Sequence, residues 1–196
     1  MSHLSLISGS SWLNLCQTQI QSQKKHQRKM SMHKTILSSD QTLQKIKRIA
    51  FEIYEKNFEE ESVVLAGIKG EGYEMARLLE VFLKEISQLK VHLMQIDLNK
   101  DHPHTSPVQF DLDKQLLSRK VIIVVDDVLN TGRTLAYSLS PFLGVSLKRL
   151  QVAVMVNRAH HSFPIFADYV GYALSTTLNE HIQVKLTGDE IGVYLS

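Results

Sequence analysis

The chain has 196 residues, of which 43% are hydrophobic and 21% are charged, and its formal net charge is +2. This size and composition suit one soluble globular domain with a short appendage, and no apolar run approaches the roughly 20 residues that span a bilayer. The single cysteine excludes an internal disulfide, which fits a reducing, cytoplasmic location.

Residues 1–33 differ in composition from the rest of the chain. They are rich in Ser and Gln, contain four Lys and Arg but no Asp or Glu, and show no sustained hydrophobic periodicity. This composition predicts a disordered basic tail ahead of a domain at 34–196. That domain holds the other 18 Lys and Arg and all 20 Asp and Glu, so its charge of −2 disfavours RNA as a partner.

Short apolar runs alternate with amphipathic segments through residues 34–196. Apolar positions spaced by three and four predict a helix capped by Ser39 or Asp40, a second helix over Met75–Ile86, and a third ending near Pro141. This alternation predicts an α/β fold with a mainly parallel twisted sheet flanked by helices. The predicted strands are Val63–Ile68, Val91–Leu98, Val121–Val125, Leu150–Val156 and Asp168–Tyr172, followed by a C-terminal hairpin of Ile182–Leu186 and Ile191–Leu195.

Three loops follow the strands at the edge where parallel sheets bind their ligands. They are Lys69–Gly72, the polar segment Asn99–Ser118, and Asp126–Thr134. The third is the most informative, because two adjacent carboxylates precede a loop of small hydroxyl residues and glycine at a helix start. Such a loop leaves backbone N–H groups free to hold a phosphate, while the carboxylates can accept hydrogen bonds from sugar hydroxyls.

The segment IIVVDDVLNTGRTL (Ile122–Leu135) resembles the motif that binds 5-phosphoribosyl 1-diphosphate (PRPP) in type I phosphoribosyltransferases. The resemblance implies that Asp126 and Asp127 bind the ribose hydroxyls and are catalytic together with Lys100. It also implies that Lys69 and Gly70 bind the pyrophosphate. The residues implied to bind the 5′-phosphate are Asn130, Thr131, Gly132, Arg133 and Thr134.

Within this superfamily, Thr35–Tyr194 resembles the bifunctional pyrimidine-operon attenuator and uracil phosphoribosyltransferase family. The segments AGIKGEGYEMARLL, VVDDVLNTGRTL and LQVAVMVNRAHHSFPIFADYVG carry this resemblance. Two departures stand out, because Glu71 and Lys100 occupy positions where that family usually has arginine. The carboxylate of Glu71 disfavours pyrophosphate binding in this turn unless the side chain points outward or helps to place Mg²⁺. In type I enzymes this turn also often holds a non-proline cis peptide.

The resemblance implies a type I phosphoribosyltransferase fold and a Mg²⁺-dependent transfer of the phosphoribosyl group from PRPP to a nucleobase, with uracil favoured. Base-binding candidates are Arg158, His160 and Tyr172, although His160 could equally face water. No side chain is assigned as a direct metal ligand, since Asp126 or Asp127 can reach Mg²⁺ through ribose hydroxyls or water. A homodimer or higher homo-oligomer is expected.

Two alternatives remain open. The first is a non-catalytic, PRPP- or nucleotide-sensing regulator of pyrimidine genes that binds RNA. The second is a purine phosphoribosyltransferase acting on hypoxanthine, guanine or xanthine, because the Lys69-Gly70 pair resembles the corresponding turn of those enzymes.

Overall fold

The computed structural model describes residues 34–100, 102–103, 105, 108–111, 114–158, 160, 162–175, 180–188 and 190–195. The tail predicted at 1–33 lies outside these residues. Residues Thr35–Leu195 form one compact unit. In the part that is described, no helix is long and apolar enough to cross a membrane.

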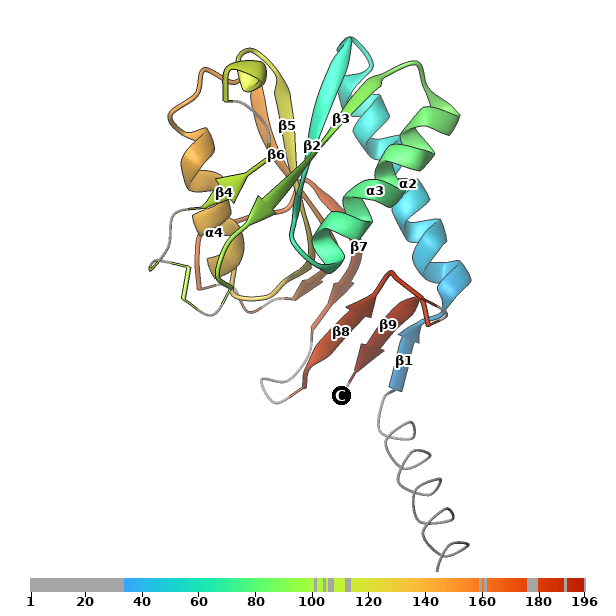
Figure 1. Ribbon diagram of the computed structural model, residues 1–196. Helices are drawn as coiled ribbons and strands as arrows, with labels where there is room; N and C mark the ends of the chain where they lie inside the picture. The colour runs from blue at the N-terminus through green and yellow to red at the C-terminus, as the bar shows by residue number, and fades with distance from the viewer. Residues whose placement is uncertain are drawn as a thin grey trace, which may run out of the picture. The chain divides into compact units, whose positions relative to one another are not determined.

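The main sheet has six strands in the order β4-β3-β2-β5-β6-β7 (Figure 1). Its five longer strands pair in parallel, which confirms the predicted sheet, and β4 is antiparallel to β3. The strands are β2 (Ser62–Ile68), β3 (Lys90–Asp97), β4 (Gln109–Phe110), β5 (Val121–Leu129), β6 (Arg149–Arg158) and β7 (Tyr169–Leu174).

Helices cover both faces of this sheet (Figure 1). α2 (Ser39–Asn57) and α3 (Glu71–Ile86) pack on one face, and α4 (Arg133–Leu139) packs on the other with the 3₁₀ turn Ser140–Phe142. The cap of α2 is Ser38 rather than Ser39 or Asp40. Its hydroxyl accepts the backbone N–H of Gln41, whose side chain accepts the N–H of Ser38 in return, so the two form a capping box.

The central strand β5 shows why the apolar run Val121–Val125 exists. All five of these residues are fully buried. Val121, Ile123 and Val125 face the layer of α2 and α3, whereas Ile122 and Val124 face the layer of α4. Because successive side chains of a strand point to opposite faces, a strand covered on both sides must be apolar throughout.

A second sheet has three strands in the order β1-β9-β8. β8 (Ile182–Lys185) and β9 (Gly192–Leu195) form the predicted antiparallel hairpin. β1 (Lys34–Leu37) was not predicted, because four residues are too few to show a period.

The loop prediction over Asn99–Ser118 was wrong in part, since its described residues include β4 and a 3₁₀ turn at Lys114–Leu117. β5 also runs further than predicted, to Leu129, so the adjacent acids Asp126 and Asp127 lie inside the strand rather than in the loop after it.

Candidate active site

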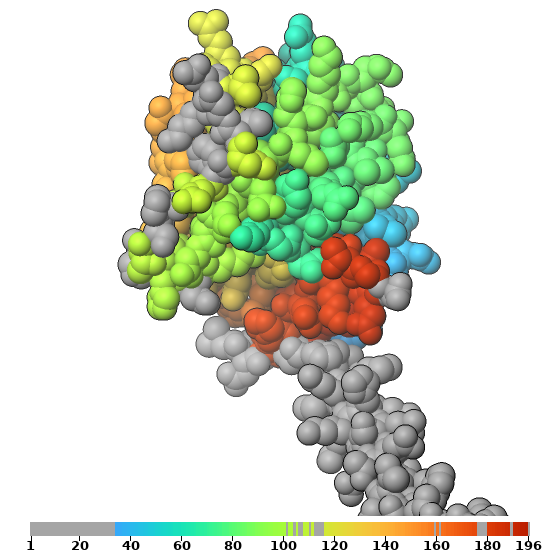
Figure 2. Space-filling model, viewed as in Figure 1, coloured from blue at the N-terminus to red at the C-terminus, as the bar shows by residue number. Residues whose placement is uncertain are grey.

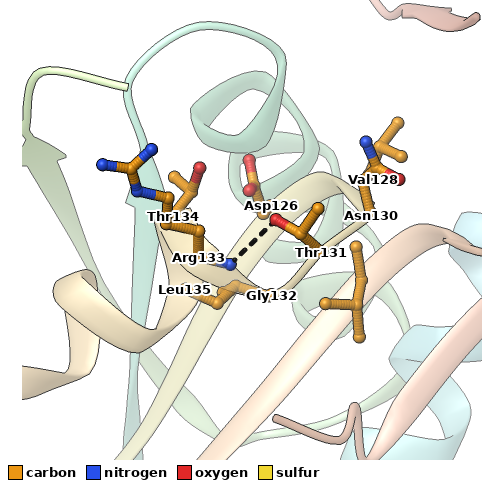
Figure 3. Close-up of a pocket in the computed structure, with 9 residues that line it drawn as sticks. Asp126, Val128, Asn130, Thr131, Gly132, Arg133, Thr134 and Leu135 are labelled. Carbon is orange, nitrogen blue, oxygen red and sulfur yellow. Dashed lines mark hydrogen bonds between the residues drawn. The ribbon is translucent and has the colours of Figure 1, made fainter. Parts of the chain in front are cut away.

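A cavity of about 130 Å³ lies at the carboxyl end of β5 (Figure 3). Asp126 and Thr131 are both among the residues that line it. The whole lining comes from one stretch of the predicted motif, so a single strand and the loop that follows it build the cavity. The lining residues are Asp126, Val128, Leu129, Asn130, Thr131, Gly132, Arg133, Thr134 and Leu135.

The loop after β5 is held by the segment that follows β6. The carbonyl oxygen of Thr131 accepts the N–H groups of both Ser162 and Phe163 at 2.9 Å, and the Thr131 hydroxyl accepts the N–H of Arg133 at 3.3 Å (Figure 3). Gly132 has a φ of +81°, and a Cβ there would lie 3.3 Å from the Cβ of Ile165. Glycine therefore serves both the left-handed turn and the close approach.

The two acids of the site differ in environment. Asp126 is only 3% exposed, whereas Asp127 is half-buried and donates its N–H to the Asp126 carboxylate at 3.1 Å. Burial raises the pKa of Asp126 well above its usual value, and the charge of Asp127 raises that pKa further. Lys100 acts in the opposite direction and lowers this pKa.

Two lysines predicted to contact PRPP are paired with carboxylates. The Lys100 ammonium lies 3.7 Å from the Asp126 carboxylate and 4.0 Å from that of Asp127, so the structure brings the three catalytic candidates together. The Lys69 ammonium lies 2.6 Å from the carboxylate of Asp97 at the end of β3. In this state each of these lysines is paired with carboxylates at the same edge of the sheet.

The turn after β2 leads directly into α3. Gly70 has a φ of +99°, and its carbonyl accepts the N–H groups of Tyr73 and Glu74. Every peptide bond among the described residues is trans, so the cis peptide that type I enzymes often have in this turn is absent. Gly72 approaches β5 so closely that a Cβ there would lie 2.9 Å from the carbonyl oxygen of Val125.

Glu71 makes a contact that the sequence did not predict. Its carboxylate accepts the backbone N–H of Leu186 at 2.7 Å, across 115 residues of chain. The side chain is thereby directed to the C-terminal hairpin. No local pattern could reveal this contact, because the partner is a backbone group distant in sequence.

The three base-binding candidates lie at the carboxyl ends of β6 and β7 or just beyond. Arg158 is 4% exposed at the end of β6, and His160 is half-buried two residues later. Tyr172 on β7 is opposite Val156 on β6, and Val156 is opposite Val128 on β5. The Tyr172 side chain packs against the apolar cluster of α2 and α3. Tyr172 thus lies two strand spacings, about 10 Å, from the line of β5.

Comparison with known proteins agrees with this geometry. The phosphoribosyl transferase domain family matches residues 32–187. The chain is 37% identical over 161 residues to the Bifunctional protein PyrR of Haemophilus ducreyi, covering 79% of this chain and 90% of that protein. The protein of the same name from Fusobacterium nucleatum is 35% identical over 160 residues, covering 78% and 90%.

Solved structures show the same fold. The hypoxanthine phosphoribosyltransferase of Trypanosoma cruzi has a TM-score of 0.66 at 19% identity, covering 82% of this chain and 95% of its own. A hypoxanthine-guanine phosphoribosyltransferase of Bacillus anthracis has a TM-score of 0.58 at 20% identity, covering 73% and 84%. These neighbours share the fold of this chain. The family match and the relatives above 30% identity show that the chain belongs to the type I phosphoribosyltransferase family and is similar to Bifunctional protein PyrR.

Proposed function

We propose that the protein transfers the 5-phosphoribosyl group from PRPP to a nucleobase, with uracil favoured, and releases pyrophosphate. One observation carries this proposal. The acid pair, a loop with hydroxyls and backbone N–H groups, and a cavity of about 130 Å³ occur together at the end of β5, and Lys100 lies against the acids. A phosphorylated sugar has the hydroxyl donors and the phosphate acceptor that match the two halves of this site.

The assigned roles follow from charge. Asp126 and Asp127 would accept hydrogen bonds from the ribose 2′- and 3′-hydroxyls, because two carboxylates repel an anion but suit a diol. The segment Asn130–Thr134 would donate to the 5′-phosphate. Lys69 and Gly70 would bind the pyrophosphate from the neighbouring turn, which brings both ends of PRPP to one edge of the sheet.

The reaction breaks the bond between C1′ and the pyrophosphate oxygen and forms a bond between C1′ and a base nitrogen. The electron pair of the broken bond leaves with pyrophosphate, and the ribose becomes positively charged on the way. The proton of the attacking base nitrogen passes to water or to the released pyrophosphate. The protein would act by holding both reactants in line and by stabilising this charge. Lys100 would leave the acid pair as the ribose binds and would then neutralise the pyrophosphate.

The residues fit a magnesium ion that is shared with the substrate. Among the described residues, no group of three or more His, Cys, Asp or Glu side chains is placed to hold a metal. Mg²⁺ commonly keeps several waters and takes phosphate oxygens with one or two carboxylates, so Asp126 or Asp127 would suffice beside PRPP. When bound, the ion supplies charge that stabilises the departing pyrophosphate.

One assay tests which nucleobase accepts the phosphoribosyl group. PRPP and Mg²⁺ are incubated with uracil, hypoxanthine, guanine, xanthine or adenine in turn, and pyrophosphate is measured, with a chelator as control. We expect release with uracil. Release with purines alone would replace uracil by a purine, as the Lys69-Gly70 turn suggests. Binding of PRPP without release for any base would overturn the transferase assignment.

A second function is supported by relatives at 35–37% identity, which are named as bifunctional proteins. An RNA-binding regulator would shift RNA in a gel, and its affinity would fall steeply with salt. The charge of −2 on residues 34–196 predicts weak binding at physiological salt. Tight, salt-sensitive binding that PRPP or a nucleotide alters would support this second function.

A further inference from the structure

The contact between Glu71 and Leu186 joins two parts of the molecule that the chain keeps far apart. Glu71 is the first residue of α3 and follows directly on Lys69 and Gly70. Leu186 follows β8 of the C-terminal hairpin, and the surface of this hairpin lies directly against that of α3 (Figure 2). The Glu71 carboxylate therefore connects the proposed pyrophosphate turn to the hairpin.

The backbone N–H of Leu186 in the hairpin needs a hydrogen-bond acceptor. The paired residues of β8 and β9 run from Ile182 opposite Leu195 to Lys185 opposite Gly192, so Leu186 lies beyond the last pair. Its side chain is 5% exposed and belongs to the apolar cluster of α2 and α3. A backbone N–H in such surroundings needs a partner, and the Glu71 carboxylate is the one it has.

A lysine of the hairpin lies near Glu71. Lys185 precedes Leu186, forms an ion pair with Glu190 and lies over the ring of Tyr194. The pKa of Lys185 is raised, chiefly by its hydrogen bond to Glu190, and the charge of Glu71 adds to this effect. The Glu71 carboxylate therefore lies within electrostatic reach of this lysine, which already forms an ion pair with Glu190.

The same turn also contacts the acid pair. Gly72 lies so close to β5 that a Cβ would be 3.0 Å from the Cα and from a carboxylate oxygen of Asp126. A continuous series of contacts therefore runs from Leu186 through Glu71 and Gly72 to Asp126. Tyr172 packs in the apolar cluster that also contains Leu186.

We propose that Glu71 is a positioning residue that fixes the C-terminal hairpin on the turn after β2, and so shapes the base side of the site rather than contacting pyrophosphate. The kinetic part of this inference rests on the proposed transferase function. The structural part does not, because it concerns only the protection of the Leu186 N–H.

Two substitutions of Glu71 separate the effect of its side-chain length from the effect of its charge. Glu71→Gln keeps an oxygen acceptor at the same distance and removes the charge, whereas Glu71→Asp keeps the charge and shortens the side chain by one methylene. If Glu71 acts by holding Leu186, the Gln variant resembles wild type and the Asp variant resembles Glu71→Ala. If the negative charge in the turn is what matters, the order is reversed.

Hydrogen exchange of the Leu186 amide, followed by NMR, is the primary measurement. We expect exchange to become about tenfold faster in Glu71→Asp and Glu71→Ala, since a hydrogen bond to a charged group is lost. Glu71→Gln should stay close to wild type. The control Glu74→Asp alters a carboxylate in the same helical turn that pairs with Arg77 and should leave Leu186 unchanged.

Kinetics provide the second measurement. KM for uracil should rise in Glu71→Asp but not in Glu71→Gln, and any change in KM for PRPP should follow the same order, because the contacts of the turn also reach Asp126. Faster exchange at Leu186 in Glu71→Gln, or full protection in Glu71→Asp, would overturn the positioning role. If wild type turns over no base, the transferase proposal fails instead, and hydrogen exchange still decides the role of Glu71.

Discussion

At the scale of single residues, Asp127 and Thr131 are assigned to opposite ends of the phosphoribosyl group. Asp127→Asn should weaken PRPP binding about ten- to a hundredfold, because a charge-assisted hydrogen bond is lost. The protein should remain folded, since repulsion with the buried Asp126 decreases. Thr131→Val should weaken PRPP and ribose 5-phosphate alike but leave pyrophosphate binding unchanged. Calorimetric titration of all three ligands checks this, and wild-type PRPP affinity in both folded variants would refute the site.

Lys100 is one of the groups that influence the protonation of Asp126, again at the residue scale. The pKa of Asp126 is raised from 3.8 by burial and by Asp127, and Lys100 lowers it. A carboxyl group with a raised folded-state pKa binds its proton more tightly when folded, so unfolding free energy falls as pH rises from 3.8 through that pKa. Lys100→Met should raise the pKa of Asp126 further, so this loss should continue to higher pH and become larger in total.

Urea unfolding over a pH series measures this effect. The control Lys84→Met removes an exposed lysine that pairs with Glu80 on α3, and it should leave the pH dependence unchanged. Identical pH profiles for Lys100→Met and wild type would mean that the lysine does not influence the acid pair in solution.

At the scale of elements, sequence patterns predicted the strands and helices that depend on neighbouring residues in the chain. The apolar run of β5 and the three-and-four spacing of α2 and α3 need only neighbouring residues, so the main strands and helices were found. β1 and β4 were missed because they have only four and two residues and are defined by pairing with other strands, β9 and β3 respectively. The extension of β5 through Asp126 was missed because adjacent acids normally indicate a strand end.

The packing of α3 on β5 makes Gly72 critical. A Cβ there would lie 2.9–3.0 Å from the Val125 carbonyl oxygen and from Asp126, so α3 must shift or the acid must move. Gly72→Ala should destabilise the fold by about 1–3 kcal/mol and weaken PRPP binding. Gly144→Ala is the matched control, because nothing lies within 4 Å of its added Cβ. Thermal unfolding and PRPP titration decide the outcome, and equal behaviour of both variants would contradict the predicted clash.

At the scale of the whole molecule, the candidate site could be predicted where it is contiguous in sequence. The acid pair and its loop occupy Ile122–Leu135, so one stretch of sequence contains the whole cavity lining. The contacts that hold this site are long-range, from Thr131 to Ser162 and from Glu71 to Leu186, and they depend on the complete fold. Sequence therefore predicts which groups line this cavity better than it predicts what holds them in place.

The boundary of the folded unit gives the last prediction. Both apolar clusters and every candidate site residue lie within Thr35–Leu195, and the family match begins at residue 32. Deleting residues 1–33 should therefore leave PRPP affinity and Tm nearly unchanged. Deleting residues 1–37 also removes β1 and the buried Leu37, whose burial alone stabilises by about 1.5–3 kcal/mol, so Tm should fall. Calorimetry of the two truncations locates the boundary: a large drop in Tm already in the shorter deletion would show that the tail packs on the domain.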